Sequence, residues 1–228
     1  MELQSLREQI LHTDNAFSVV LADSRKQVEA ACRLRYQVYC LERGFEPGRD
    51  GVETDQFDSR ARHVLLVHRA SGEPIGTVRV IPSSFADGLH DLPMTAVCAP
   101  GLLRNLPALT TGEISRFAVS KQRRMTCQAG AMVRLGLMRG ILRLSHEMGL
   151  THWCAIMEPT LIRLLQMSSI HFSPLGPLVE YHGLRQPACL NIAAVLDLAR
   201  FERPDAWNYV TLGGTLSQRD QVPARLAA

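Results

Sequence analysis

Short apolar runs and longer stretches with apolar residues three or four positions apart alternate along this chain. The short runs predict strands, because they are bounded by Gly, Pro, Asp or Ser. These strands are expected at residues 17–22, 63–69, 75–81, 113–120 and 151–157, with two more near 177–182 and 188–194. The helical spacing predicts helices from Asp23 or Ser24 to about Leu41, from Thr126 to Met148, and from Pro159 to about Met167.

The segments between these elements carry weaker patterns. A weak helix is expected before residue 17, a short one up to Arg200, and a loose tail over 201–228. Residues 82–111 are rich in Pro and Gly and predict an insertion with at most short helices. The order β-α-β-β-β-α-β-α-β-β predicts one domain over 1–228, with a core of about 17–200. The fold class is therefore α/β, with a mixed central sheet flanked by helices.

Composition narrows the classes of function. Of 228 residues, 46% are apolar and 21% are charged, which is typical of a globular protein. The net charge of +3 is too small to indicate nucleic-acid binding. No apolar run is long enough to span a membrane, and the first nine residues lack the core of a signal peptide, so we expect a cytoplasmic location. The six cysteines form no CxxC pair or Cys/His spacing, so reduced thiols and no metal site are expected.

The run Gly112–Ser120 places two opposite charges, Glu113 and Arg116, in an apolar strand. In a regular strand Ile114, Arg116 and Ala118 share one face, while Glu113, Ser115 and Phe117 share the other. Burying either charge is costly unless it has a partner. The alternative is an edge strand whose charges are solvated.

Other charges upstream could join this strand in one cleft. Arg35 lies near the apolar stripe of the first long helix, Arg79 lies inside an apolar strand, and Asp55 and Asp58 lie in the polar loop 42–60. Long loops in compact domains tend to be functional or disordered. Three arginines and three carboxylates could therefore converge where a helix, its following loop and two strands meet. A purely structural ion-pair network is the alternative.

Four blocks of sequence now carry a resemblance over about residues 30–160. They are Leu34–Tyr39, Glu53-x-Asp55-x-Phe57-Asp58, Gly76–Pro82 and Glu113–Phe117. Their order and spacing resemble the autoinducer (acyl-homoserine-lactone) synthases and, more closely, the long-chain N-acyl amino acid synthases. The segment Arg35–Glu46 is most similar to acyltransferases associated with the PEP-CTERM/exosortase system.

The resemblance implies a GNAT-like fold and an enzyme that transfers a fatty acyl group from an acyl carrier protein thioester, or from acyl-CoA, to an amine. The donor is a substrate, and no tightly bound cofactor is implied. By position, the charged active-site cluster of the family corresponds to Arg35, Asp55, Asp58, Arg79, Glu113 and Arg116. Tyr39 and Phe45 correspond to aromatic positions beside the acceptor pocket. Homoserine lactone synthases usually carry Trp where Phe45 stands, which argues against S-adenosylmethionine as the acceptor.

Physical chemistry suggests roles for these residues. An amino acid must lose a proton from its α-amine before it attacks a thioester, and Glu113 could accept that proton. Asp55 could hold the ammonium form, and Arg79 or Arg116 could bind the α-carboxylate. Backbone N–H groups of Phe117, Ala118 and Val119 could stabilise the oxyanion.

Basic residues after the strand suggest where the donor binds. Lys121, Arg123 and Arg124 could engage the pantetheine phosphate and an acidic carrier protein, or could be ordinary solvated charges. The segment 124–130 holds a single glycine and provides poorly for a CoA diphosphate. An acyl channel is expected between the sheet and the helix near Leu161–Met167.

The sequence therefore predicts an N-acyltransferase that makes a long-chain N-acyl amino acid. The alternatives are a homoserine lactone synthase and a non-catalytic GNAT-like protein that binds acyl chains.

Overall fold

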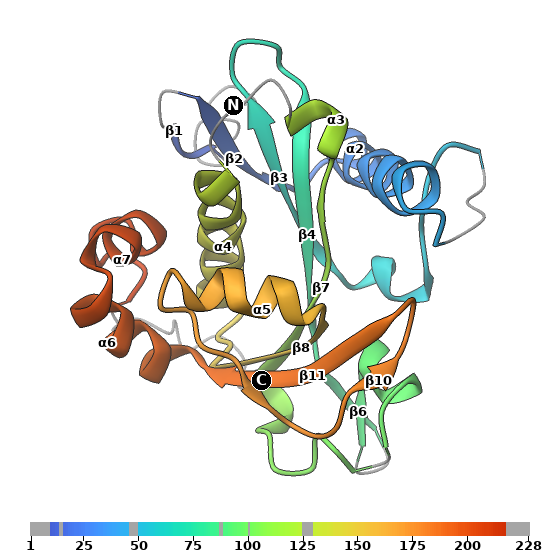
Figure 1. Cartoon of the computed structure of the whole chain (residues 1–228), viewed down its shortest axis with the longest axis vertical. Helices are drawn as coiled ribbons and strands as arrows, with labels where there is room; N and C mark the ends of the chain where they lie inside the picture. The colour runs from blue at the N-terminus through green and yellow to red at the C-terminus, as the bar shows by residue number, and fades with distance from the viewer. Residues whose placement is uncertain are drawn as a thin grey trace, which may run out of the picture.

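A nine-stranded sheet runs through the part of the chain that this computed structural model describes, which is residues 10–13, 16–45, 50–86, 89–99, 101–124 and 130–217 (Figure 1). Its strands follow the order β1-β2-β3-β4-β7-β8-β11-β10, and β9 also pairs with β11. The sheet strands are β1 (Ile10–Thr13), β2 (Phe17–Ala22), β3 (Arg62–His68), β4 (Pro74–Pro82), β7 (Thr111–Val119), β8 (His152–Met157), β9 (Ser173–Pro174), β10 (Val179–Glu180) and β11 (Leu184–Asn191). A separate ribbon consists of β5 (Ser84–Ala86) and β6 (Leu89–Asp91).

Helices connect these strands and cover both faces of the sheet. The α-helices are α2 (Arg25–Tyr36), α3 (Lys121–Arg124), α4 (Gly130–Glu147), α5 (Pro159–Gln166), α6 (Ile192–Glu202) and α7 (Pro204–Thr211). A π-helix, η1 (Gln37–Glu42), continues α2, and the 3₁₀ turns are η2 (Gln56–Ser59), η3 (Pro93–Ala96) and η4 (Ala108–Thr110). Among the described residues, no helix has the length and apolarity needed to cross a bilayer.

The site is positioned by a break in the sheet between β7 and β8. These two strands are parallel neighbours and pair only over Thr111–Glu113 and His152–Cys154. Beyond Glu113, β7 continues alongside β4, whereas β8 continues alongside β11. The two halves of the sheet therefore diverge after Glu113 and leave an opening between β7 and β8 (Figure 1).

Alternating side chains on β3 show how the two faces are filled. Val64 and Leu66 belong to the main core, which includes residues of α4, while Leu65 packs with Ala31 of α2 on the other face. The approach of α4 to the sheet is close: a Cβ at Gly140 would lie 2.3 Å from Val64 Cγ1. Glycine at this position therefore lets α4 pack directly on β3.

The N-terminus of α2 confirms the predicted start of this helix. The Ser24 side chain accepts a hydrogen bond from the Gln27 N–H, and the Gln27 side chain reaches back to the Ser24 N–H, which makes a capping box. The expected extension to Leu41 is present as the π-helical turn η1. The following loop is not wholly irregular, because Asp55 caps the 3₁₀ turn η2.

Several boundaries differ from the sequence prediction. Residues 10–13 are a strand rather than part of a weak helix, because they pair with β2. The strand expected over 177–182 is reduced to β10, and β11 begins at Leu184 rather than at 188. The segment 82–111 also contains the β5–β6 ribbon. Residues 125–129, where the long helix was expected to start, lie outside the described residues.

The prediction of a loose tail from residue 201 is wrong up to residue 217. Residues 204–211 form α7, which buries Ala206 and Val210 in the main core. Arg139 of α4 donates from Nε to the carbonyl oxygen of Tyr209 at 2.8 Å and stacks on its ring, at 3.4 Å from the centroid. Apolar burial and this contact hold α7 against α4. Residues 218–228 lie outside the described part of the chain.

A bulge in β7 changes the faces that were expected for this strand. Thr77 pairs with Ala118 and Arg79 pairs with Ser115, so β7 has one more residue than β4 between these pairs. Arg116 occupies this position with φ of +53°, in the left-handed region. The expected alternation therefore fails after Ser115. Phe117 packs with Ile114 against the main core, whereas Ala118 packs against α2.

Candidate active site

A cavity of about 370 Å³ lies at the opening between β7 and β8. One part of its wall is charged and aromatic, with residues from η1, the following loop, β7 and the β10–β11 turn. The other part is apolar and comes mainly from α4, α5 and β8. The apolar residues include Val133, Met138, Ile156, Met157, Leu161, Leu164, Leu165 and Phe172. The helix expected beside an acyl channel thus contributes three leucines to this wall.

Beside this cavity, Arg79 of β4 ties the loop of residues 53–58 to the sheet. Its Nη1 and Nη2 atoms lie 2.7 and 2.6 Å from the two oxygens of Asp55, and Nη1 lies 2.6 Å from Asp58 Oδ1. Its Nε donates to Ser115 Oγ on the neighbouring strand at 2.9 Å. Arg79 is fully buried, so two carboxylates and a hydroxyl satisfy its guanidinium.

Arg35 and Arg116 complete the cluster with a third carboxylate, Glu53. Arg35 is fully buried and binds Glu53 through Nε and Asp58 through both terminal nitrogens, at 2.6 and 3.1 Å. Arg116 donates from Nη2 to Glu53 Oε1 at 2.9 Å and to Asp55 Oδ2 at 3.2 Å. Three arginines and three carboxylates therefore form one balanced network, which the bulge at Arg116 completes.

Charge pairing keeps these carboxylates ionised in spite of their burial. Burial raises the pKa of Asp58, but the hydrogen bonds and positive charge of Arg35, together with Arg79, hold it well below its ordinary value. For Glu53, burial likewise raises the pKa, and Arg35 and Arg116 lower it below the ordinary value. Burial and the nearby arginines lower the pKa of His63, which lies beneath the network, to about 4. His63 is therefore neutral at physiological pH.

Glu113 lies on the cavity wall but outside this ion-pair network. It is 2% exposed, and its Oε2 accepts a hydrogen bond from the Met94 N–H at 2.8 Å. Burial raises its pKa to about 7, against the lowering effects of the Met94 N–H, Arg79 and Arg116. A carboxylate with a pKa near neutrality is suited to accept a proton from a substrate.

Aromatic rings line the charged part of the cavity. Tyr39 stacks against Phe45 with centroids 6.4 Å apart, and Phe45 stacks on His182 at 5.2 Å. The Arg116 guanidinium lies 5.8 Å from the Tyr39 centroid. The structure therefore places Tyr39 and Phe45 beside Arg116 of the charged network, whereas Glu113, which was predicted to belong to that cluster, lies outside it.

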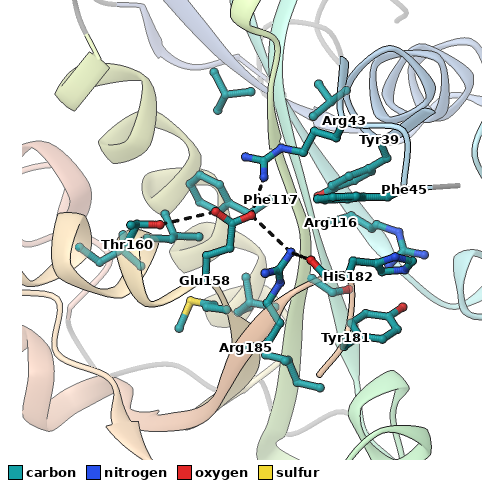
Figure 2. Close-up of a pocket in the computed structure, with 18 of the residues that line it drawn as sticks. Tyr39, Arg43, Phe45, Arg116, Phe117, Glu158, Thr160, Tyr181, His182 and Arg185 are labelled. Atoms are coloured by element: carbon teal, nitrogen blue, oxygen red, sulfur yellow. Dashed lines mark hydrogen bonds and ion pairs between the residues drawn. The ribbon is translucent and has the colours of Figure 1, made fainter. Parts of the chain in front are cut away.

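Opposite these rings, Glu158 at the end of β8 bridges two arginines (Figure 2). Arg43 Nη1 lies 2.5 Å from Glu158 Oε1, and Arg185 Nη2 lies 3.4 Å from the same atom. In Figure 2, Glu158 points into the cavity between the two guanidinium groups. This bridge joins the loop after η1 to the half of the sheet that contains β8 and β11.

The basic residues after β7 are only partly described. Lys121 is exposed and lies on the cavity wall, and Arg123 pairs with Glu73 at 3.3 Å and with the Pro74 carbonyl oxygen at 2.8 Å. The side chain of Arg124 lies outside the described part of the structure. The carboxylate of Glu42 accepts hydrogen bonds from the Lys121 N–H at 2.9 Å and from Ser120 Oγ at 2.6 Å.

Sequence reasoning did not select four residues of this site. Glu53 stands two positions before Asp55, so its membership in the acidic motif was an available signal. Arg43, Glu158 and Arg185 gave no such signal, because their contacts join segments far apart in the chain, with 115 positions between Arg43 and Glu158.

Comparisons with known proteins give one family model and several solved structures that are similar to this chain. The family model described as N-acyl amino acid synthase FeeM matches residues 30–193. No curated protein matches the chain.

Several solved structures share the fold. The CoA-dependent acyl-homoserine lactone synthase BjaI is 23% identical, with a TM-score of 0.60, and the match covers 85% of this chain and 97% of that one. FeeM from uncultured soil microbes is 17% identical, with a TM-score of 0.58 and coverage of 81% and 95%. A protein assigned as an N-acetyltransferase from Lactobacillus plantarum is 18% identical, with a TM-score of 0.52 and coverage of 77% and 97%. The predicted GNAT-like fold class is confirmed.

Proposed function

The chain belongs to the N-acyl amino acid synthase FeeM family of acyltransferases, and from this premise we propose that it transfers a long-chain fatty acyl group from an acyl carrier protein thioester to the α-amine of an amino acid. One observation carries the proposal: a single cavity joins a buried carboxylate of raised pKa, Glu113, to an apolar wall that suits an acyl chain. The resemblance to PEP-CTERM/exosortase-associated acyltransferases and a cytoplasmic location remain parts of this proposal.

Glu113 is the general base of the proposed reaction. The acceptor amine loses a proton to Glu113, directly or through one water molecule, and its nitrogen attacks the thioester carbonyl carbon. A C–N bond forms, the C–S bond breaks, and the thiolate of the donor leaves; it takes up the proton that the nitrogen loses as the amide forms. Because Met94 engages only Oε2, Oε1 of Glu113 remains available to face the amine.

The other charged residues then separate into two roles. Arg35, Arg79 and Asp58 hold the loop of residues 53–58 on the sheet, since both arginines are fully buried and paired. Glu53 and Arg116 line the cavity. They are better placed than Asp55 and Arg79 to contact the acceptor, and Glu53 is the carboxylate that we expect near its ammonium group.

The oxyanion would be stabilised by backbone N–H groups on the open side of β7. The Ser120 N–H donates to the Ile75 carbonyl oxygen on β4 at 3.0 Å. Because N–H directions alternate along an antiparallel pair, Val119 directs its N–H away from β4, toward the opening, whereas Ala118 directs its N–H toward β4. Phe117 and Val119 both line the cavity, and this supports Val119 as the principal donor.

The acyl donor would enter past Lys121. This residue is exposed at the cavity wall, and its charge suits a phosphopantetheine phosphate and an acidic carrier protein. Glu42 accepts hydrogen bonds beside it, so the phosphate would meet the side chain of Lys121 rather than its N–H group.

One incubation tests this function. The purified protein is mixed with long-chain acyl carrier protein or the matching acyl-CoA, a pool of amino acids, and S-adenosylmethionine, and the products are identified by mass spectrometry. An N-acyl amino acid formed faster from the carrier protein supports the proposal. An acyl-homoserine lactone with methylthioadenosine would assign the alternative activity, and acyl binding without any product would indicate a non-catalytic protein.

A further inference from the structure

The two groups of charges that face the cavity are balanced differently. In the network around Asp55 and Asp58, each of the three arginines contacts two carboxylates. Outside this network, Arg43 and Arg185 both contact Oε1 of one carboxylate, Glu158. This second group therefore carries one positive charge more than it carries negative charge. Two guanidinium groups directed at one carboxylate oxygen are a fitting receptor for an anion.

We propose that Arg43 and Arg185 form the subsite that binds the α-carboxylate of the acceptor, and that Glu158 occupies this subsite when the acceptor is absent. This inference rests on the proposed function and identifies how the acceptor is selected. It assigns the carboxylate to residues that do not belong to the buried network.

The two arginines are held in place by contacts other than the one with Glu158. The guanidinium carbons of Arg43 and Arg185 lie 5.5 and 5.8 Å from the centroid of Phe45, so both stack against one ring. Arg185 also donates to the carbonyl oxygens of His182 and Leu184, at 2.6 and 3.1 Å. Its side chain is only 13% exposed. These contacts fix the direction of its guanidinium, which lowers the entropic cost of binding an anion.

Glu158 has the chemistry of an internal substitute for the acceptor. Its carboxylate is the same group as the α-carboxylate of an amino acid, and it points into the cavity from the end of β8 (Figure 2). Its side chain is 33% exposed. It can therefore rotate into solvent when a substrate carboxylate displaces it. The carboxylates of the buried network cannot exchange so readily, because Arg35 and Arg79 are fully buried and each binds two carboxylates.

The position of this subsite also suits the reaction. Glu113, Phe45 and Arg185 all line the same cavity, and the proposal requires that an amino acid whose carboxylate is at Arg185 directs its amine toward Glu113. An amine without a carboxylate would leave the surplus charge uncompensated. The enzyme should therefore prefer amino acids to their carboxamides.

The test compares an amino acid with its carboxamide as acceptors. The amino acid is the one whose N-acyl product is found in the incubation described above. The wild-type kcat/KM should favour the acid by roughly 10- to 100-fold, as expected for a charge-assisted hydrogen bond. In Arg185→Gln and in Arg43→Gln, this preference should fall at least about tenfold, with the change mainly in the KM of the acid. Arg33→Gln, at an exposed arginine that pairs with Glu29 on α2, is the matched control and should keep the wild-type ratio.

Glu158→Gln distinguishes two roles of Glu158: a placeholder, which occupies the subsite until the acceptor displaces it, and a structural bridge between the two arginines. If Glu158 competes with the substrate, its loss should lower the KM of the acid several-fold and leave that of the carboxamide unchanged. An increase in both KM values, or no change, would overturn the placeholder role. If the wild type prefers the acid and both arginine variants keep that preference, the subsite assignment fails while the proposed function stands. If the wild type acylates neither compound nor any amino acid, both fail.

Discussion

The backbone N–H of Met94 donates to Oε2 of Glu113 at 2.8 Å, in an environment where Glu113 is 2% exposed. This single hydrogen bond favours the ionised carboxylate, but burial has the larger effect and raises its pKa to about 7. The contact joins the insertion after β4 to β7. It therefore fixes one oxygen of the carboxylate at the point where β7 and β8 separate.

The raised pKa of Glu113 has a consequence for stability. The folded protein binds this proton more tightly than the unfolded chain, whose glutamate has a pKa near 4.5, so this group makes the folded state less stable as pH rises from about 4.5 to 7. Glu113→Gln removes that effect and should raise the free energy of unfolding at pH 8 by up to about 3 kcal/mol. Urea unfolding at pH 5 and pH 8 measures it. An equal effect of the substitution at both pH values would contradict the raised pKa.

The bulge at Arg116 predicts an unusual order of two substitutions. Arg116 has φ of +53°, a conformation that glycine adopts freely and alanine does not. Both Arg116→Gly and Arg116→Ala lose the contacts with Glu53 and Asp55. The glycine variant should nevertheless be more stable than the alanine variant by about 1 kcal/mol, as measured by chemical unfolding. A more stable alanine variant would be evidence against the bulge.

Asp58 should be required for folding stability rather than for chemistry. Asp58→Asn removes the carboxylate that both Arg35 and Arg79 contact and leaves two buried guanidinium groups undercompensated. The free energy of unfolding should fall by about 3–5 kcal/mol. Glu29→Gln, at an exposed ion pair, should change it by less than about 0.5 kcal/mol. A change of that small size in Asp58→Asn would mean that the network does not hold the loop.

The same network predicts how stability depends on acid. Asp58, Asp55 and Glu53 have pKa values below their ordinary range in the folded state, despite the opposing effect of burial. Their stabilising contribution is therefore complete above about pH 5 and is lost as pH falls below about 4. Thermal unfolding between pH 6 and pH 3 should show a steep loss for the wild type and a smaller one for Asp58→Asn. If the two proteins lost stability in parallel, the ion-pair network would not be the origin of the acid dependence.

The apolar part of the cavity should set the length of the acyl chain. Leu161 and Val133 line it from α5 and α4, so Leu161→Trp and Val133→Phe reduce its volume. Both variants should lose activity with long-chain donors by roughly tenfold or more while they retain activity with short ones. Leu198→Trp, at an exposed position on α6, is the control. Equal losses for all chain lengths would show that the acyl group binds elsewhere.

Local patterns in the sequence predicted most of the sheet. Apolar residues alternate in β3 and β4 and form a helical stripe in α4. These patterns directly indicate which side chains are buried. The convergence of Arg35, Arg79 and Arg116 with acidic partners was also predictable, because charges inside apolar elements need compensation. In each case the pattern lies within one helix or strand. It predicts the structure because burying a polar or charged side chain costs free energy.

The features that the sequence did not reveal depend on contacts between distant segments. The bulge changes the faces of Phe117 and Ala118, yet it occurs at an arginine rather than at a glycine that would have indicated it. The contact of Arg43 with Glu158 spans 115 positions. The docking of α7 depends on Arg139, which lies on a helix 70 positions earlier.

The most direct test concerns Glu113 as the base. Single-turnover acylation of an amino acid is measured in the wild type and in Glu113→Gln from pH 5.5 to pH 9, with near- and far-UV circular dichroism to confirm that both are folded. The glutamine keeps an oxygen for the Met94 N–H but cannot accept a proton. We expect the wild-type rate to rise with an apparent pKa near 7, and the variant to be slower by roughly 100-fold without that step. A folded variant that acylates at nearly the wild-type rate, with the same pH profile, would contradict the role of Glu113.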